Sequence, residues 1–214
     1  MKKVLGVLIS LFLVCFSATA AELSGSVEMH SRLISTFSGT NYSENPAMVA
    51  QFTVTKGLSF TGFFSADLKD TQSFANIQDF IVHGTKTIGQ TAITGMLETV
   101  RYGGVKGAYL YPSVNVAQPL GKGFGVNFLY CYGIEGLNDY EDMGNYTMTH
   151  IGLTKKFDNW SVVARGHRNA NKSNFSSAVT REINKNVSLT GFFHLNDVRG
   201  TLTHFGGVTV GYSF

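Results

Sequence analysis

The last thirteen residues of the chain, 202–214, alternate between apolar and polar positions, and this pattern constrains the fold more than any other feature of the sequence. Val208, Val210, Tyr212 and Phe214 share one side of a two-residue period, while small or polar residues occupy the other side. Such alternation is typical of a β-strand with one apolar face. A strand at the end of a chain leaves an edge unpaired unless the sheet closes on itself. We therefore predict that this strand closes a barrel whose outer surface contacts lipid.

This terminal pattern resembles the last strand of Gram-negative outer-membrane β-barrels. In those proteins the final Phe and the alternating apolar residues form the signal that the barrel assembly machinery reads. The resemblance implies that Val208, Val210, Tyr212 and Phe214 are an assembly signal and that the assembly machinery is a partner. It also implies a location in the cell outer membrane, in contact with lipid and lipopolysaccharide.

The first twenty residues have the layout of an export signal. Lys2 and Lys3 precede an apolar run, 4–16, and small residues follow as far as Ala20. A transmembrane anchor would need roughly 20 apolar residues, and this run is too short. We predict a secretory signal peptide over 1–20, cleaved after Ala20, and a single outer-membrane β-barrel domain over 21–214.

Composition narrows the function classes. Without Lys2 and Lys3 the basic count falls from 17 to 15, against 14 acidic residues, so nothing favours a nucleic-acid partner. Charged residues make up 14% of the chain, compared with roughly 25% in soluble domains, while Gly (24) and Phe (17) are abundant. Cys131 is the only cysteine outside the predicted leader, which rules out an internal disulfide. These features favour a membrane barrel, with a secreted β-sandwich as the alternative.

Alternation and turn signals predict an all-β fold, namely an antiparallel transmembrane β-barrel of about twelve strands with both termini periplasmic. Ten or fourteen strands are compatible with the same signals, because each segment's signal is weak. The predicted strands cover 22–38, 47–56, 58–69, 76–86, 91–102, 107–117, 123–134, 145–156, 160–169, 175–185, 187–197 and 201–214.

The connections should alternate between short periplasmic turns and longer outer loops. Tight turns are predicted at Lys56–Gly57, 157–159 and 184–186, and a longer inner connection at 118–122. Pro112 cannot donate a ladder hydrogen bond, so we predict a bulge or kink there.

Alternate residues of a strand face opposite sides of the sheet, so each residue's parity, odd or even along its strand, predicts whether it faces the lumen. This assigns a set of polar side chains to the lumen. The set mixes acidic, basic and neutral groups, which predicts either a narrow water-filled pore or a lumen filled by paired side chains; we favour the pore. The lumen-lining candidates are Glu28, His30, Arg32, Asp67, Lys69, Asp79, His83, Glu98, Asn127, His150, Arg165, His167, Glu182, His194 and Asn196. In chain length and in its short predicted loops, the chain is similar to small monomeric sugar-acid porins of twelve strands. Those porins line the lumen with arginines, whereas inward Arg here is nearly limited to Arg32 and Arg165.

No catalytic residue and no cofactor is predicted. The Ser-His-Asn context of outer-membrane phospholipases and lipid A deacylases is absent, and the chain is not expected to be an enzyme. A lipid-modifying hydrolase remains as a third alternative, since His204 shares the lipid-facing parity and Ser31 or Ser35 could approach it across the barrel closure. No metal is predicted, because the His residues lie one per strand and the acidic loop Asn138–Asp142 lacks EF-hand spacing. The favoured function is a narrow porin-like channel for passive diffusion of small hydrophilic solutes, and the second alternative is a structural or surface-interaction outer-membrane barrel with a filled lumen.

Overall fold

A computed structural model describes residues 21–34, 41–43, 45–69, 77–102, 109–133, 146–169, 172–198 and 200–214. All of its regular elements are β-strands. They are β1 (Glu22–His30), β2 (Leu33–Ile34), β3 (Asn41–Ser43), β4 (Ala47–Lys56), β5 (Leu58–Asp67), β6 (Ile77–Ile88), β7 (Thr91–Tyr102), β8 (Tyr109–Gly121), β9 (Phe124–Gly133), β10 (Tyr146–Phe157), β11 (Trp160–Asn169), β12 (Lys172–Glu182), β13 (Val187–Val198) and β14 (Thr201–Ser213).

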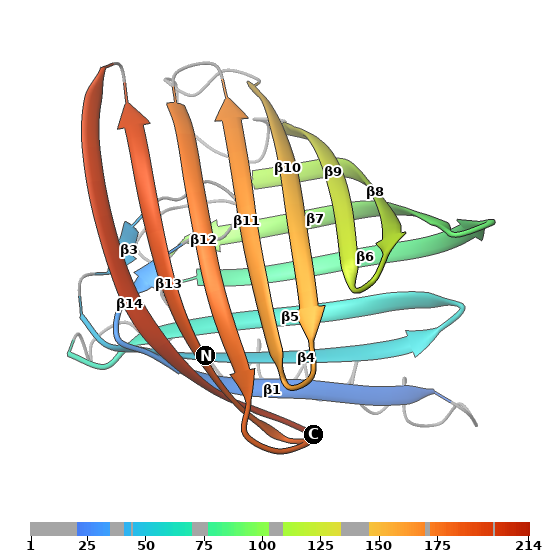
Figure 1. The fold of residues 1–214 in the computed structure, drawn as a ribbon, viewed down its shortest axis with the longest axis horizontal. Coiled ribbons are helices and arrows are strands. Elements are labelled where there is room, and N and C mark those ends of the chain that lie inside the picture. Colours follow the sequence, from blue (N-terminus) through green and yellow to red (C-terminus); the bar gives the residue numbers. More distant parts are fainter. Residues whose placement is uncertain are drawn as a thin grey trace, which may run out of the picture.

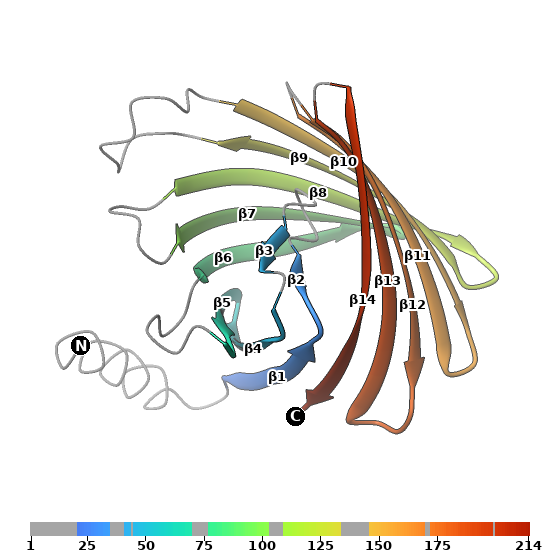
Figure 2. The ribbon, with the colours of Figure 1, turned by 90° about the vertical axis from the view of Figure 1, so that its left-hand side faces the viewer.

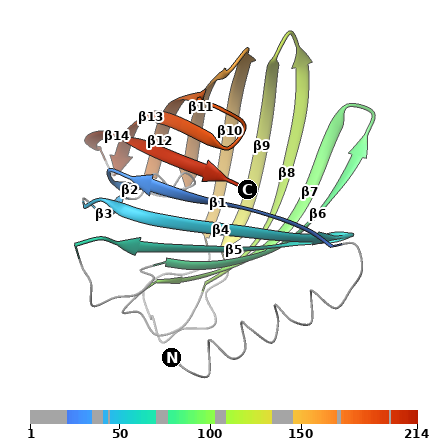
Figure 3. The same ribbon diagram turned by 90° about the horizontal axis from the view of Figure 1, so that it is seen from below.

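Twelve of these strands form one closed antiparallel barrel (Figure 1). Each strand pairs with its neighbour in sequence from β4 to β14, and β1 closes the ring between β4 and β14 (Figure 3). The small sheet of β2 and β3 stands apart from the barrel wall (Figure 2). The predicted fold class and strand number are confirmed. The predicted signal peptide lies outside the described residues.

The predicted first strand, 22–38, leaves the barrel wall after His30, where the side chain of Ser31 interrupts the ladder; residues 35–38 of that prediction lie outside the described residues. Ser31 N still donates to the Val208 carbonyl over 2.9 Å, but the Val208 amide donates to Ser31 Oγ, also over 2.9 Å, instead of to a backbone carbonyl. A side chain thus takes the place of the next ladder bond. The chain then bends, and Leu33–Ile34 pair with β3.

The expectations for the sixth predicted strand also need correction. β8 passes straight through Pro112, which pairs with Leu97. Since Pro112 has no N–H, its pair with Leu97 must be a non-hydrogen-bonded pair. The nitrogen of Pro112 therefore faces β9, and the pairing of β8 with β9 begins one residue later, at Ser113. The irregularity lies instead between Pro119 and Gly121. The strand therefore extends through most of the predicted inner connection 118–122.

The connections at one end of the barrel are all tight. β4 turns into β5 at Gly57, with φ of 77°, and β6 turns into β7 through Gly89, with φ of 61°. The other connections at this end have two residues at 122–123 and 158–159 and four at 183–186, and they include the turns predicted at 157–159 and 184–186. The first described residue of the barrel and Phe214 lie at this same end, here called the turn end; the opposite end is the loop end.

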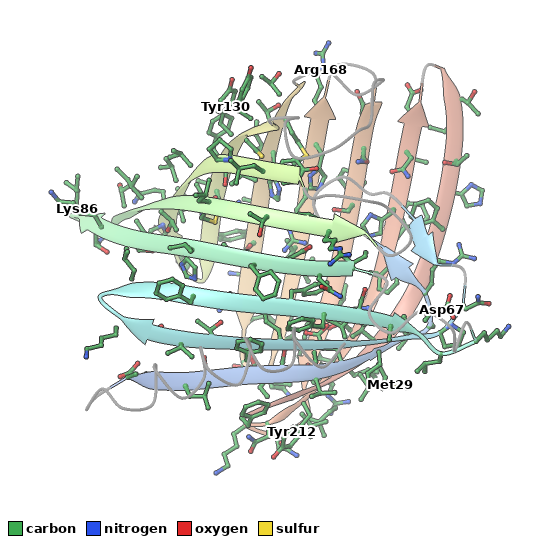
Figure 4. All side chains as sticks on the ribbon, turned by 180° about the vertical axis from the view of Figure 1, so that it is seen from behind. Met29, Asp67, Lys86, Tyr130, Arg168 and Tyr212 are labelled. Atoms are coloured by element: carbon green, nitrogen blue, oxygen red, sulfur yellow. The ribbon has the colours of Figure 1, made fainter. Side chains whose placement is uncertain are left out.

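Large apolar side chains cover the outside of the wall. Met29, Tyr130 and Tyr212 point away from it (Figure 4) and are exposed, and each barrel strand carries at least one exposed large apolar residue on its outer face. The alternate positions face the lumen, and most of them carry polar or small residues. No helix among the described residues is long and apolar enough to span a membrane.

The seam between β1 and β14 closes the barrel with five residue pairs, from Ser26↔Ser213 to His30↔Thr209. Gly25 and Phe214 add reciprocal backbone hydrogen bonds of 3.1 and 3.0 Å. The Phe214 ring covers Gly25 so closely that a Cβ on that glycine would lie 2.5 Å from the ring Cζ and 2.7 Å from the Gln51 carbonyl. The seam therefore depends on the absence of a side chain at residue 25.

Gly25→Ala should destabilise the barrel by about 1–3 kcal/mol, because the new methyl group overpacks both neighbours of β1. Urea unfolding of the refolded protein, followed by tryptophan fluorescence, measures the change. Gly95→Ala is the matched control, since a Cβ there would meet nothing within 4 Å. Equal effects of the two substitutions would show that the ring of Phe214 does not constrain residue 25.

Candidate functional site in the barrel lumen

The turn-end half of the lumen is lined by hydroxyl groups that pair across neighbouring strands. The hydrogen-bonded pairs are Thr53 with Thr61 (2.9 Å), Thr55 with Ser59 (3.0 Å), Thr85 with Thr94 (2.8 Å) and Thr180 with Thr190 (2.8 Å). A hydroxyl carries one donor and two acceptor sites, so each pair keeps capacity for water or a solute. These pairs form an uncharged, hydrophilic surface.

The loop-end half carries a band of apolar side chains from β4 to β10. Ala47 and Val49 of β4 are 0% and 2% exposed, and they belong to one packed cluster with buried residues of the following strands. The other members of this apolar band are Ile77, Val100, Tyr111, Cys131 and Met148, and Phe63 packs against it. Burial of inward residues shows that side chains narrow the lumen at this level.

The remaining wall of the loop-end half is polar. His150 of β10 and His167 of β11 are direct cross-strand partners, and their rings meet edge to face at 4.5 Å. His194 of β13 stacks on Phe205 of β14 at 5.6 Å. Two further polar residues of β12, Asn174 and Ser176, are also buried on this wall. Imidazole, amide and hydroxyl groups therefore face the lumen from β10 to β13.

Several of these polar atoms have no hydrogen-bond partner among the described residues. They include both ring nitrogens of His167, Nδ1 of His194 and Oγ of Ser176, in side chains that are only 4–5% exposed. A buried polar atom without a partner costs roughly 1–3 kcal/mol. The polar wall is thus suited to bind water or polar groups of a solute.

Charges of opposite sign occupy different walls. The carboxylates of Asp67, Asp79 and Glu98 lie on β5, β6 and β7. Arg165 lies on β11, where it pairs with Gly152 of β10 and Ser176 of β12. The order of strands in the ring places β11 opposite β5. The lumen therefore has an acidic side and a basic side.

A small network on the acidic side joins the lumen to the seam. His30 Nε2 lies 2.9 Å from Glu28 Oε2, and His30 Nδ1 lies 3.0 Å from Thr209 Oγ1 across the closure. On β5, Asp67 accepts hydrogen bonds from Asn45 Nδ2 (3.1 Å) and from the backbone of Lys69 (2.8 Å).

Most of the predicted lumen residues lie on inward positions of the barrel strands, and three lie at its margins. Arg32 follows the end of β1 and is half-buried in the bend before β2. Lys69 follows the end of β5 and is exposed, and Glu182 is exposed at the turn end of β12. The structure brings Asn127 to 3.5 Å from His150 Nε2 and places His83 Nε2 3.4 Å from the Thr61 hydroxyl. The inward or half-buried members are Glu28, His30, Arg32, Asp67, Asp79, His83, Glu98, Asn127, His150, Arg165, His167, His194 and Asn196.

Sequence reasoning missed part of the polar wall and all of the apolar band. Asn174 was missed because the strand was predicted to begin at 175 and it begins at Lys172, whereas Ser176 lay inside the predicted strand with the parity of Glu182 and was not singled out. Ser65 shares the parity of Asp67 and is buried, yet a lone hydroxyl carries little signal.

The hydrolase alternative gains no support from the described residues. Ser31 accepts the Val208 amide, which is four residues along β14 from His204, or about 13 Å at the rise of a strand. Ser35 lies outside the described residues, as does the acidic loop Asn138–Asp142. In the part of the chain that the structure describes, no group of three or more His, Cys, Asp and Glu side chains could hold a metal ion.

Comparison with solved structures gives several likenesses. The KdgM porin superposes with a TM-score of 0.60 at 10% identity, covering 91% of this chain and 99% of the porin. A KdgM porin in complex with disordered oligogalacturonate gives the same score and coverage at 11% identity. The NanC porin superposes with a TM-score of 0.58 at 12% identity, covering 90% of this chain and 99% of its own. This chain has a porin fold. At such identities the likeness concerns the fold alone. No protein-family model matches the sequence, and no curated protein sequence matches it either.

The contrast between the two halves of the lumen can be tested by thiol labelling. In a Cys131→Ser background, Thr180→Cys at the turn end should react with a charged methanethiosulfonate reagent at least about tenfold faster than Ser176→Cys, because thiol reactivity follows access. Both positions face inward from β12, so strand and parity are matched. Equal rates would contradict a narrowed loop end.

Proposed function

We propose that the protein is an outer-membrane channel for passive diffusion of small hydrophilic solutes. The observation that carries this proposal is the alternation around the whole barrel: apolar outward side chains suit lipid, and the inward face offers hydroxyl, imidazole, amide and charged groups. The shared fold with the KdgM and NanC porins supports it. KdgM is a porin found with oligogalacturonate, but the single inward arginine of the polar wall, Arg165, does not favour an acidic saccharide here.

The proposal includes the surroundings of the barrel. The turn end, with Phe214, would face the periplasm, because short turns mark that side in barrels of this class. Export would use residues 1–20 as a cleaved signal. Assembly would use Val208, Val210, Tyr212 and Phe214, all exposed on the outer face of β14, as the signal for the barrel assembly machinery. Membrane lipid and lipopolysaccharide would contact the apolar outer surface.

A structural barrel with a filled lumen is the second candidate, and the burial of the apolar band favours it. Ala47, Val49 and Ile77 are almost completely covered at the loop end. Single-channel recordings in planar bilayers separate the two functions: a channel gives discrete conductance steps, and a filled barrel gives none. We propose no catalytic role for either case.

Charge inversion on the polar wall should change ion selectivity. Arg165→Glu should shift the ratio of cation to anion permeability toward cations by about fivefold to tenfold, because unit charges a few ångström apart interact by about 1 kcal/mol even in water. Reversal potentials in a salt gradient measure the ratio. Arg168→Glu is the matched control, since Arg168 has the opposite parity on the same strand and is exposed at the top of the barrel (Figure 4). A similar change of the permeability ratio in both variants would show that the lumen charge of Arg165 does not determine ion selectivity.

A further inference from the structure

A strip of aromatic and basic side chains crosses the outer surface at the turn end of β9–β12. Phe124 pairs across strands with Lys155, Phe157 with Trp160, and Trp160 with Arg181, so the five residues are contiguous. Their positions have outward parity, and Trp160 is 37% exposed. We call this strip the turn-end patch.

Each cation of the patch lies over a ring. Lys155 Nζ is 4.1 Å from the centroid of the Phe124 ring, and Arg181 Cζ is 5.4 Å from the centroid of the Trp160 ring. Contact with a ring orients a cation and shields its stem, but it does not neutralise the charge. Lys155 also donates to the Lys122 carbonyl, which fixes the ammonium at the turn.

The charges of the patch are not balanced by the protein. No carboxylate among the described residues lies within ion-pairing distance of Lys155 or Arg181, and the guanidinium of Arg181 makes no hydrogen bond to another described residue. Lys122 and Lys185, in adjacent turns, add positive charge, and together with Lys155 and Arg181 they outnumber the two nearby carboxylates of Asp158 and Glu182. The net charge of the patch is therefore positive.

We propose that the turn-end patch binds the phosphodiester headgroup of an anionic phospholipid in the leaflet that meets the turn end. Aromatic side chains sit at headgroup depth in membrane barrels, so Phe157 and Trp160 place the two cations beside lipid phosphates. An ammonium and a guanidinium on neighbouring strands supply charge-assisted donors to phosphate oxygens. The inference rests on the membrane placement proposed above.

Trp160 is the only tryptophan of the chain, so it reports on lipids at the patch. The full chain is refolded into vesicles of phosphatidylglycerol and phosphatidylcholine at one fixed ratio, with brominated acyl chains on either the first lipid or the second. Brominated phosphatidylglycerol should quench Trp160 more strongly. The enrichment near the ring should reach about fivefold per basic residue at low salt, and it should fall near 1 M salt, where the Debye length is about 3 Å.

The variant Lys155→Gln with Arg181→Gln should lose the preference, while Lys86→Gln should keep it. Lys86 is an exposed turn-end lysine on the far tip of the β6–β7 hairpin (Figure 4), with no ring contact to a described residue. Equal quenching by the two brominated lipids in the wild type, or a preference that survives in the double variant, would overturn the proposal and leave the patch to another partner. Quenching by neither lipid would show that the barrel is not inserted, which would overturn the membrane placement as well. Heat-modifiable gel mobility confirms that each variant is folded.

Discussion

Closure of the backbone hydrogen bonds at the β1–β14 seam is the constraint on which the whole barrel depends. In hydrocarbon no solvent can bond an open strand edge, so a single unpaired seam would expose both strands. The seam is short: β13 and β14 share twelve residue pairs, whereas β1 and β14 share five. Side chains reinforce it at both ends, with the Phe214 ring over Gly25 at the turn end and Ser31 on the Val208 amide at the loop end.

The same closure determines the chemistry of the lumen. Because successive residues of a strand point to opposite faces, the register that puts Tyr212 and Val210 on the outer face also puts Thr209 against His30 inside. The ring of strands then sets the acidic residues of β5–β7 across the lumen from the imidazoles of β10–β13. At the loop end the apolar band shares the β4–β10 wall with the acidic residues of β5–β7, whereas the wall from β10 to β13 carries the imidazole, amide and hydroxyl groups. We expect a polar solute to follow that wall, where His167 and Ser176 have unpartnered polar atoms among the described residues.

Much of this arrangement could be predicted from the sequence, because a period of two residues carries both the strand and the assignment of its faces. The inward position of residues such as His150 and Arg165 follows from that period, and the period together with the turn signals predicted about twelve strands. The ends of strands were harder to predict. They depend on whether a side chain replaces a backbone hydrogen bond, as at Ser31, or on a register shift, as at Pro119. Packing inside the lumen could not be predicted. The contact between His150 and His167 requires the register of two strands, which alternation does not fix.

Glycine and phenylalanine are both abundant in the chain, and three phenylalanine rings lie over glycines of neighbouring strands. These contacts depend on the strand register and cannot be read from the sequence pattern. The Phe52 ring covers Gly62 on the outer face, the Phe192 ring covers Gly207 inside the lumen, and the Phe214 ring covers Gly25 at the seam. A glycine within a strand weakens the sheet by itself, and an aromatic ring laid on its backbone restores the lost packing. The same contact occurs on the outer face and inside the lumen, because it depends on packing between ring and backbone rather than on release of water. The terminal Phe214 therefore has a structural role in the closed barrel that is separate from any role as an assembly signal.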